Sequence, residues 1–408
     1  MSKTGYADLP LHYGRVPPWL ANRMASLGGK IVQTIVQDYG KKEVLKRLSD
    51  PFWFQSFGAV LGMDWHSSGI TTSVMGALKK SVNPLSHELG IHICGGRGRH
   101  SRKTPVELRR LSEKTGINGD ELVQCSRLSA KIDSTAVQDG FQVYLHNFIV
   151  TDDGEWAVVQ QGMNDKNGYA RRYHWYSENM KSFLNDPHSA VCGLNQGKII
   201  NMVHTDAANT REMTIDVATE HPTKMIQEIK KITLPPNHDV QIKDVDLKRL
   251  GAVIALAHES EIEDFESLLL VNGLGPRTLQ SLVLVSEVIH GTPSRFSDPA
   301  RFSFAHGGKD GHPFPVPSKV YDEVIDFMSQ TVDKSKIEYT DKQKALKKLH
   351  ELAKRVEKNF TPDESKFDKW IEEEKRNSEK YGGRTVFDDR SPAIKRVSKP
   401  ENGQLKLF

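Results

Sequence analysis

A polar hairpin in the middle of the chain carries the side chains best suited to chemistry. Residues 142–150 alternate in hydropathy like a strand, and residues 156–163 continue as a returning strand. Between them, Asp153-Gly154 suits a two-residue turn. That register places His146 opposite Gln161, so both side chains share one face of the hairpin. Because buried polar groups are costly unless they are satisfied or used, the hairpin is a candidate site.

Two aspartates lie just before this hairpin and complete a candidate catalytic set. Asp133 and Asp139 supply oxygen ligands of the kind that Mg²⁺ or Mn²⁺ prefers. A Gln or His nearby would orient a water molecule for attack on a phosphodiester. Hydrogen-bonded structural residues are the alternative interpretation. The candidate catalytic residues are Asp133, Asp139, His146 and Gln161, with Asp133 and Asp139 as metal ligands and with His92 and His188 as further members.

A second motif, Gly273-Leu274-Gly275, interrupts an apolar helical stretch. Residues 262–271 before it are amphipathic, and Pro276 after it suits the first turn of a second helix. The motif resembles the helix-hairpin-helix of DNA-binding proteins, although an ordinary helical hairpin is the alternative. Glycines let the backbone approach a phosphate, and free N–H groups of the second helix bind that anion without reading bases. The candidate DNA contacts are Gly273, Gly275, Arg277 and Thr278.

A basic, glycine-rich segment at residues 95–110 offers another phosphate contact. It holds six Lys or Arg residues and one acid. Thr104 and Glu107 have the spacing of a capping box, which predicts a flexible loop that ends at a helix N-terminus. The helix dipole, N–H donors and guanidinium groups would then meet at one spot, and a solvated basic loop is the alternative. The candidate contacts are Arg97, Arg99, Arg102 and Lys103.

The last five residues form an apolar pentapeptide at the end of a polar tail. It closely resembles the Gln-Leu-x-Leu-Phe peptide by which bacterial repair and replication proteins dock on the sliding clamp. The two terminal apolar residues would fill a pocket on the clamp, and the glutamine would hydrogen-bond in a second cleft. Packing of the tip onto the chain's own surface is the alternative. The predicted clamp contacts are Gln404, Leu405, Leu407 and Phe408.

The composition narrows the setting in which this chemistry would occur. Of 408 residues, 37% are hydrophobic and 26% are charged, which excludes wholesale disorder. No apolar run is long enough to cross a membrane, and the N-terminus lacks the pattern of a secretion signal. The three cysteines form no CxxC pair, so neither a zinc ribbon nor a disulfide framework is indicated. We expect a cytoplasmic, nucleoid-associated protein whose net charge of +4 permits DNA as a partner.

The distribution of patterns along the chain predicts an α+β fold in four parts. The charged helices of the third part could form a dimer interface, or they could pack on the same chain with their charged faces in solvent. The sequence therefore leaves both a monomer and a homo-oligomer as alternatives. The parts are a mixed α/β, candidate catalytic domain at 1–240, a helix-hairpin-helix region with a Gly/Pro-rich extension at 241–318, charged helices at 319–381, and a disordered tail at 382–408.

Several segments together resemble a family of prokaryotic proteins that carries a domain-of-unknown-function label. The resemblance covers about residues 5–330. It implies a protein that acts on DNA, with nuclease activity as the expected activity, and it supplies no catalytic residue. The segments are Asp8–His12, Gly62–Gly69, Gly95–Arg99, Val159–Asn164, Gly273–Pro276 and Ala305–His312.

The sequence thus favours a DNA-backbone binder of repair or replication that hydrolyses phosphodiesters with Mg²⁺ or Mn²⁺ and is recruited to the sliding clamp. A non-catalytic DNA-binding adaptor that recruits other repair factors is the alternative. A base-excision glycosylase is a third, because helix-hairpin-helix modules often accompany that chemistry; beyond the hairpin the sequence offers Asp298 but no clear match.

Overall fold

The computed structural model describes most of the first three hundred residues. The described residues are 16–63, 68–164, 168–222, 247–260 and 262–300, together with 316–317, 376 and 383–384. Most of the predicted third part of the chain and nearly all of the predicted tail therefore lie outside the described residues.

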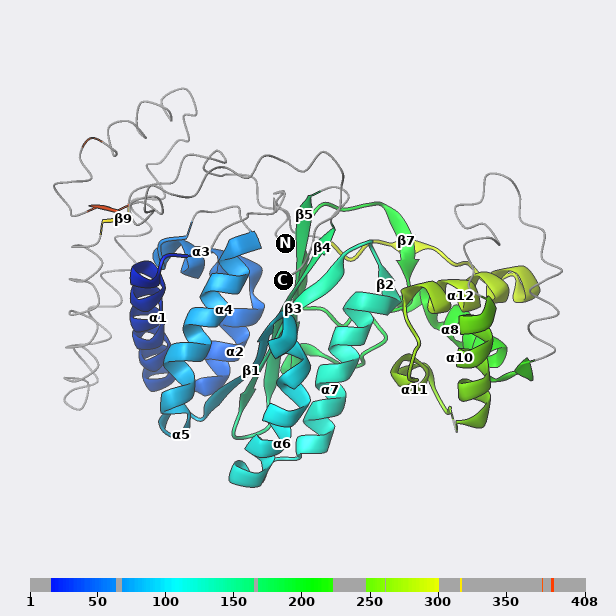
Figure 1. The fold of residues 1–408 in the computed structure, drawn as a ribbon, viewed down its shortest axis with the longest axis horizontal. Coiled ribbons are helices and arrows are strands. Elements are labelled where there is room, and N and C mark those ends of the chain that lie inside the picture. Colours follow the sequence, from blue (N-terminus) through cyan, green and yellow to red (C-terminus); the bar gives the residue numbers. More distant parts are fainter. Residues whose placement is uncertain are drawn as a thin grey trace.

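An antiparallel five-stranded sheet forms the centre of the molecule (Figure 1). Its strands run in the order β1-β3-β4-β5-β6, and β3 and β4 each contain seven consecutive buried residues. Burial on both faces of a strand requires a covering layer on each side of the sheet. The strands are β1 (Ile91–Arg97), β3 (Gln142–Thr151), β4 (Trp156–Asn164), β5 (Tyr169–Tyr176) and β6 (Ala190–Cys192).

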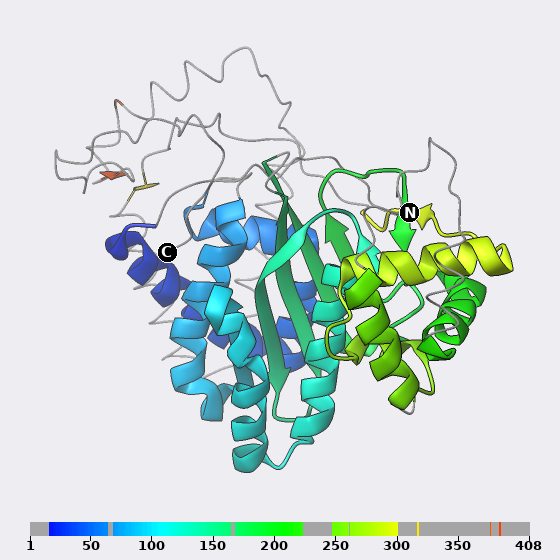
Figure 2. The ribbon, with the colours of Figure 1, turned by 45° about the vertical axis from the view of Figure 1, so that its right-hand side comes forward.

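N-terminal helices cover one face of this sheet (Figures 1 and 2). The helix boundaries follow from local chemistry: Asp50 caps α3 by accepting hydrogen bonds from the backbone N–H groups of Phe52 and Trp53, and Pro51 occupies the first turn. The helices are α1 (Pro18–Tyr39), α2 (Lys41–Ser49), α3 (Pro51–Val60), α4 (Ser68–Val82), η1 (Asn83–Leu85) and α5 (Ser86–Leu89).

Two further helices cover the opposite face and end in a π-helical turn. Asn118 caps the second of them through the backbone N–H of Glu121. The elements are η2 (Gly98–Lys103), α6 (Thr104–Thr115), α7 (Gly119–Lys131) and the π-helical turn η3 (Ile132–Ala136).

A helical unit, formed by α8, α10, α11 and α12, lies beyond α7 at one end of the molecule (Figure 1). A three-stranded sheet of order β2-β7-β8 also belongs to this end of the chain. The bounds are β2 (Val137–Gln138), β7 (Lys198–Asn201), η5 (Thr205–Ala207), α8 (Ala208–Thr219), α10 (Leu247–Glu259), α11 (Phe265–Leu270), α12 (Pro276–His290) and β8 (Phe296–Ser297). The short helix η4 (Ser177–Asn179) follows β5, and β9 (Val316–Pro317) pairs with β10 (Gly383–Arg384) in a separate two-stranded sheet. These elements confirm the α+β fold class. No helix in the described ranges combines the length and apolarity that a membrane crossing needs.

The two hydrophobic cores divide along the central sheet. Side chains such as Phe148 and Trp175 face α6, α7 and the helical unit, whereas Ile149 and Val159 face the N-terminal helices. Alternation along each strand therefore decides which layer a polar side chain reaches.

The turn between β3 and β4 differs from the predicted two-residue loop. Thr151 donates its backbone N–H to the carbonyl of Glu155 at 2.8 Å, so residues 152–154 form a three-residue turn. Gly154 takes φ +86°, as the last position of such a turn favours. The extra residue shifts the register of the hairpin by one position.

That shift changes which polar side chains meet. His146 is paired with Gln160 and not with Gln161, and Asn147 is paired with Val159. A shift of one residue moves a side chain to the other face of the sheet. The predicted sharing of one face by His146 and Gln161 is therefore wrong: His146 lies with Gln160 on the α7 side, and Gln161 lies toward the N-terminal helices.

Candidate functional site

Asp133 lies on the π-helical turn η3 with its side chain fully buried. Trp175 on β5 donates its indole N–H to the carboxylate at 2.9 Å. Gln160 on β4 and His188 in the segment before β6 also donate to it. Three donors occupy most of what a carboxylate accepts, so Asp133 is held on three sides by the protein itself.

His188 and Asp133 form a buried pair. Only 5% of the His188 side chain is exposed, and its ring centroid lies 4.4 Å from that of Trp175. An Asp–His pair is the arrangement that orients a general base. In this structure, however, the ring is enclosed too fully for a substrate to reach it, so the pair serves to hold the segment before β6 against the sheet.

His146 extends the same network toward α7. Its Nδ1 lies 2.8 Å from Oε1 of Gln160, and its Nε2 lies 2.9 Å from the hydroxyl of Ser126. Since Gln160 Oε1 only accepts, Nδ1–H is the donor and the Ser126 hydroxyl donates to Nε2, a tautomer assigned from the network. Burial lowers the pKa of His146, which therefore stays neutral.

Asp139 belongs to a separate network centred on Arg171. The Arg171 guanidinium donates to Asp139 at 2.9 Å and forms two bonds of 2.9 Å to Asp298, and all three side chains are buried. Tyr173 donates its hydroxyl to Asp139 at 2.6 Å. Burial raises the pKa of Asp139, while the charge of Arg171 opposes that rise. The triad connects β5 to the segment after β8.

Gln161 reaches neither aspartate. Its amide donates to the carbonyl of Ser68 at 2.9 Å and also to the hydroxyl of Tyr144, and Thr71 donates to its carbonyl at 2.6 Å. Gln161 thus ties β4 to the start of α4, on the side of the sheet opposite to Asp133.

A buried guanidinium, Arg172, lies on that same side. It donates to Nε2 of His174 at 2.8 Å and to Gln55 at 3.2 Å, and it lies over the ring of Phe54. His174 donates its other ring N–H to the carbonyl of Leu48, and burial together with the Arg172 charge holds the pKa of His174 well below its ordinary value.

The candidate metal ligands do not fit a Mg²⁺ or Mn²⁺ site. The carboxylate of Asp133 already accepts hydrogen bonds from Gln160, Trp175 and His188. The carboxylate of Asp139 accepts from Arg171 and Tyr173. Such ions take about six oxygen ligands in an open shell. Across the part of the chain that the structure describes, no group of three or more His, Cys, Asp or Glu side chains is arranged to hold a metal ion.

The Gly273–Gly275 hairpin joins α11 to α12. Gly273 is exposed at φ +86°, and Leu274 between the glycines is buried, 1% exposed. α12 begins at Pro276 without a side-chain cap, while Arg277 beside it is exposed. The first N–H groups of α12 are therefore not used by a capping side chain.

α11 is shorter than the predicted helix over residues 262–271. It begins at Phe265 because Asp264 accepts from the backbone N–H of Ser267 and Ser267 bonds back to Asp264, which completes a capping box. α12 ends at His290, where Gly291 takes the left-handed conformation that commonly follows a helix.

Two side chains from the α7 end of the sheet domain hold this hairpin. Lys131 donates to the carbonyl of Leu274, and Gln138 donates to the carbonyl of Pro276 at 2.8 Å. Because the hairpin carbonyls are bonded inward, the position of the hairpin is fixed relative to α7 and β2.

The basic segment forms a helical surface rather than a flexible loop. η2 runs directly into α6, and the predicted capping box is wrong: Thr104 donates to Ser101, while Glu107 accepts from Gly95 N–H at 2.7 Å and from Lys79 at 2.8 Å. The carboxylate is needed there to tie β1 to α4 and α6. The exposed basic side chains of this surface are Arg97, Arg99, Arg102 and Lys103.

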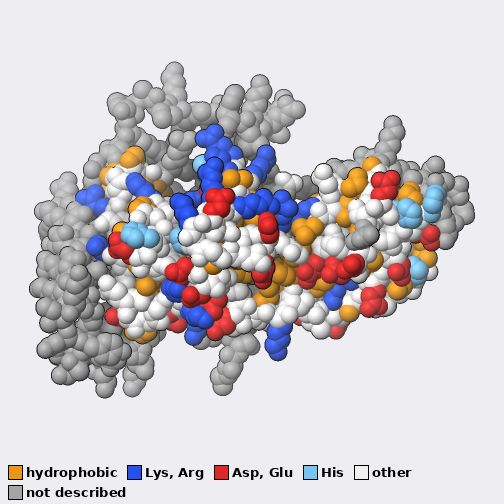
Figure 3. Space-filling model, turned by 90° about the horizontal axis from the view of Figure 1, so that it is seen from below, with side chains coloured by type: hydrophobic (Ala, Val, Ile, Leu, Met, Phe, Trp, Pro, Cys, Tyr) orange, Lys and Arg blue, Asp and Glu red, His pale blue; other side chains and the backbone are white. Residues whose placement is uncertain are grey.

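Charge is unevenly distributed on the face shown in Figure 3. Lys and Arg side chains gather in the middle of that face, whereas Asp and Glu side chains lie around and beside them. Arg110 on α6 and Arg127 on α7 are exposed as well, and α6 packs against both α7 and η2. A concentration of positive charge on one side is the electrostatic footprint of a polyanion-binding surface.

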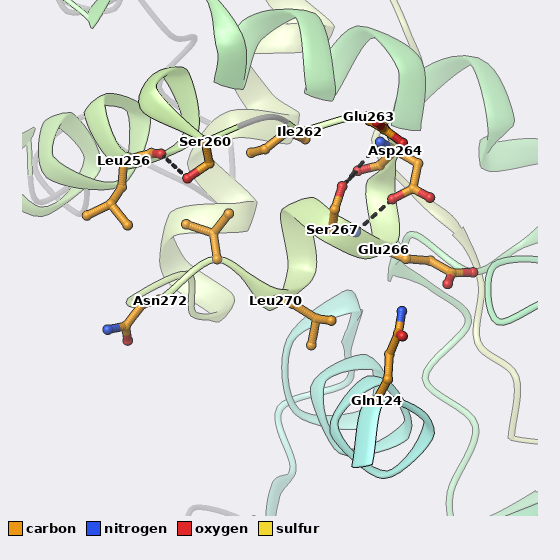
Figure 4. A pocket seen from close by; sticks show the side chains of 11 residues that line it. Gln124, Leu256, Ser260, Ile262, Glu263, Asp264, Glu266, Ser267, Leu270 and Asn272 are labelled. Carbon is orange, nitrogen blue, oxygen red and sulfur yellow. Dashed lines mark hydrogen bonds between the residues drawn. The ribbon is translucent and has the colours of Figure 1, made fainter. Parts of the chain in front are cut away.

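A cleft of about 480 Å³ opens in the helical unit beside the hairpin (Figure 4). Apolar side chains from α10 and α11 point into it, and carboxylates stand at its edge. Burial, with the nearby charge of Asp264, raises the pKa of Glu266. The lining residues are Gln124, Leu256, Ser260, Ile262, Glu263, Asp264, Glu266, Ser267, Leu270, Val271 and Asn272.

Sequence reasoning missed the residues that organise the two buried networks. Gln160, Trp175 and Arg171 were not among the predicted catalytic residues, although each is a polar group on a buried strand and each binds a predicted aspartate. The run Arg171-Arg172 within a strand was a usable signal, since adjacent strand residues face opposite layers and each guanidinium needs partners. The predicted clamp contacts Gln404–Phe408 lie outside the described residues.

A family model described as protein of unknown function (DUF763) matches residues 5–316. No curated protein and no solved structure matches the chain.

Proposed function

The chain belongs to the DUF763 family of proteins of unknown function, and we propose that it is a DNA-binding protein of repair or replication that docks on the sliding clamp. It holds the phosphate backbone at the Gly273–Gly275 hairpin and on the basic surface of η2, α6 and α7. Base edges are not read, so binding is independent of sequence.

The observation that carries the proposal is the uncapped start of α12. Its first N–H groups have no capping side chain, Arg277 is exposed beside them, and the hairpin is fixed by Lys131 and Gln138. An uncapped helix N-terminus with a guanidinium alongside has the donors and dipole that a phosphate group requires. Rigid positioning lowers the entropy cost of binding.

The C-terminal pentapeptide supplies the second half of the proposal. Leu407 and Phe408 match the two apolar anchors of clamp-binding peptides, and Gln404 matches the hydrogen-bonding residue. A tethered tip raises the effective concentration of the DNA-binding body near the ring. Deletion of residues 404–408 should abolish clamp binding in a titration while leaving DNA affinity unchanged; equal clamp affinity of both chains would remove this part of the proposal.

Metal-dependent hydrolysis is not part of this proposal, because the carboxylates of Asp133 and Asp139 already accept hydrogen bonds from protein side chains. Asp298 likewise lies in the ion pair with Arg171 and is buried, which does not suit a glycosylase nucleophile. The adaptor alternative is therefore the form of DNA binding that the geometry supports best. Plasmid cleavage by the pure protein with Mn²⁺ would contradict this choice.

DNA binding is tested by substituting both hairpin glycines. Gly273→Ala with Gly275→Ala places Cβ atoms between backbone and phosphate, so affinity should fall about tenfold or more for unrelated duplexes alike. Gly40→Ala is the matched control, because Gly40 also has positive φ (+85°), is exposed and has open space for a Cβ, but lies between α1 and α2, outside the elements proposed to contact DNA. Fluorescence anisotropy at about 50 and 200 mM salt measures both affinity and salt dependence. Unchanged affinity in a folded double variant would refute the hairpin as a DNA contact.

A further inference from the structure

The cleft between α10 and α11 has a floor and an edge of different chemistry. Leu256, which is 45% exposed, and Leu270 line the apolar floor (Figure 4), and Val271 also lines the cleft. Glu263 and Asp264 are exposed at the edge of the cleft. An exposed leucine in a concave, rimmed site is typical of an interaction surface.

The charge of the cleft is opposite to that of the DNA-binding surface. Among the described residues that line it, three are carboxylates, Glu263, Asp264 and Glu266, and none is Lys or Arg. DNA is repelled by such an edge, and an acidic peptide is repelled equally. A ligand with cationic groups spaced around apolar ones satisfies both the edge and the floor.

We propose that this cleft docks a basic, leucine-bearing segment of a partner protein, and that docking raises DNA affinity at the adjoining hairpin. The docking part stands by itself, whereas the coupling rests on the proposed function.

The coupling follows from the position of the cleft in the chain. Asn272 lines the cleft and is followed directly by Gly273 of the hairpin, so the carboxylates lie on the segment that leads into the phosphate site. Negative charge near that site opposes an incoming phosphate over roughly one Debye length. A basic ligand neutralises the carboxylates and removes the repulsion. By reciprocity, bound DNA raises the affinity for the basic ligand by the same factor.

The docking test uses a short synthetic peptide in which Lys and Leu alternate, with a Glu/Leu peptide as its charge-reversed partner. The full chain should bind the Lys/Leu peptide and not the Glu/Leu peptide in a calorimetric titration. Leu256→Gln should lose binding, and Glu263→Gln with Glu266→Gln should weaken it about fivefold. Asp264 is left intact because it caps α11.

Two matched controls separate the cleft from the rest of the helical unit. Val288→Gln removes another exposed apolar side chain, 48% exposed on α12, and Glu212→Gln removes an exposed carboxylate on α8. Both should bind the Lys/Leu peptide as the unchanged protein does. Equal binding of the two peptides, or equal loss in the controls, would overturn the docking proposal.

Other occupants of the cleft give distinct results. A dimer seen by light scattering that Leu256→Gln dissociates would assign the cleft to a second copy of the chain. Much tighter peptide binding after removal of residues 382–408 would assign it to the chain's own tail. Either result overturns the partner segment.

The coupling test measures DNA affinity with and without saturating Lys/Leu peptide. We expect the peptide to tighten duplex binding about fivefold, and Glu263→Gln with Glu266→Gln to tighten it without peptide. Peptide binding without any change in duplex affinity overturns the coupling and leaves docking supported. Absence of duplex binding under all conditions overturns the proposed function. The peptide titrations still test, independently of DNA, whether the cleft docks a basic segment.

Discussion

Replacement of Arg171 by methionine tests the buried triad that joins the sheet to the end of the helical unit. Methionine keeps most of the alkyl stem but removes the guanidinium that donates to Asp139 and Asp298 at 2.9 Å. Both carboxylates are buried, so neither gains water when the cation is lost.

The magnitude follows from two opposing contributions. At 2.9 Å and an effective dielectric constant of about 20, one pair of unit charges attracts by about 6 kcal/mol. Desolvation of the three ions offsets much of this attraction in the native protein. Removal of the guanidinium, however, leaves buried carboxylates without a compensating charge. Loss of one member of a buried ion pair costs about 3–5 kcal/mol, and we expect Arg171→Met to reduce the free energy of unfolding by that amount.

The loss should depend on pH in a definite direction. Burial already raises the pKa of Asp139, and the charge of Arg171 opposes that rise. Without Arg171 the folded-state pKa climbs further above the unfolded value of about 3.9. A folded state that binds more protons than the unfolded state loses stability as pH rises. The deficit of the variant should therefore be small at acidic pH and should grow as pH rises through the folded-state pKa.

Urea unfolding at a series of pH values measures this deficit. Arg211→Met is the control, because Arg211 is also buried but donates to the carbonyls of Leu184, Met202 and His204. Its loss should vary little with pH. A deficit for Arg171→Met below about 1 kcal/mol, or one that shrinks as pH rises, would refute the reasoning.

The remaining predictions concern close packing, a filled carboxylate and the basic surface. Gly95→Ala should lower the free energy of unfolding in urea by about 3 kcal/mol or more, because the new Cβ would lie 2.2 Å from the carbonyl oxygen of His146. Gly98→Ala is the control: Gly98 also has positive φ but open space around it, so the loss should be about 1 kcal/mol. Similar losses for the two variants would contradict the close contact at Gly95. Asp133→Asn should lower stability by about 1–3 kcal/mol, since an amide nitrogen would face a donor; a neutral effect by thermal denaturation would mean that the network is not formed. Arg99→Gln with Arg102→Gln should reduce the salt slope of duplex binding by about two, and an unchanged slope would exclude this surface from the DNA contact.

The strands of the hairpin could be predicted from the sequence, but their register could not. Alternation and the turn residues located β3 and β4 nearly to their ends. The register depends on whether the turn has two or three residues. Asp153-Gly154 suits both positions of a two-residue turn and also the last two positions of a three-residue turn. One residue decided whether Gln160 or Gln161 would join His146. Local signals specify the element, whereas its pairing depends on a single turn geometry.

The candidate site was partly predictable for a related reason. Asp133 and Asp139 were selected because they precede the polar hairpin and offer carboxylate oxygens, and both side chains are buried in the structure. Their partners come from distant parts of the chain, and no local pattern specifies that Arg171 meets Asp298. The hairpin glycines and the helix after them were predictable because capping and turn chemistry act within a few residues.

The Arg171 triad also has a consequence for the order in which the protein matures during synthesis. Arg171 contacts Asp298, 127 residues later in the chain, so translation of everything between them must finish before the guanidinium acquires both carboxylates. Until then the nascent sheet would hold a cation with incomplete compensation in its interior, and long-range closure of this kind is slow. We expect the five strands to remain loosely packed on the ribosome until residue 298 has emerged, and the sheet and the helical unit to become native together rather than in succession.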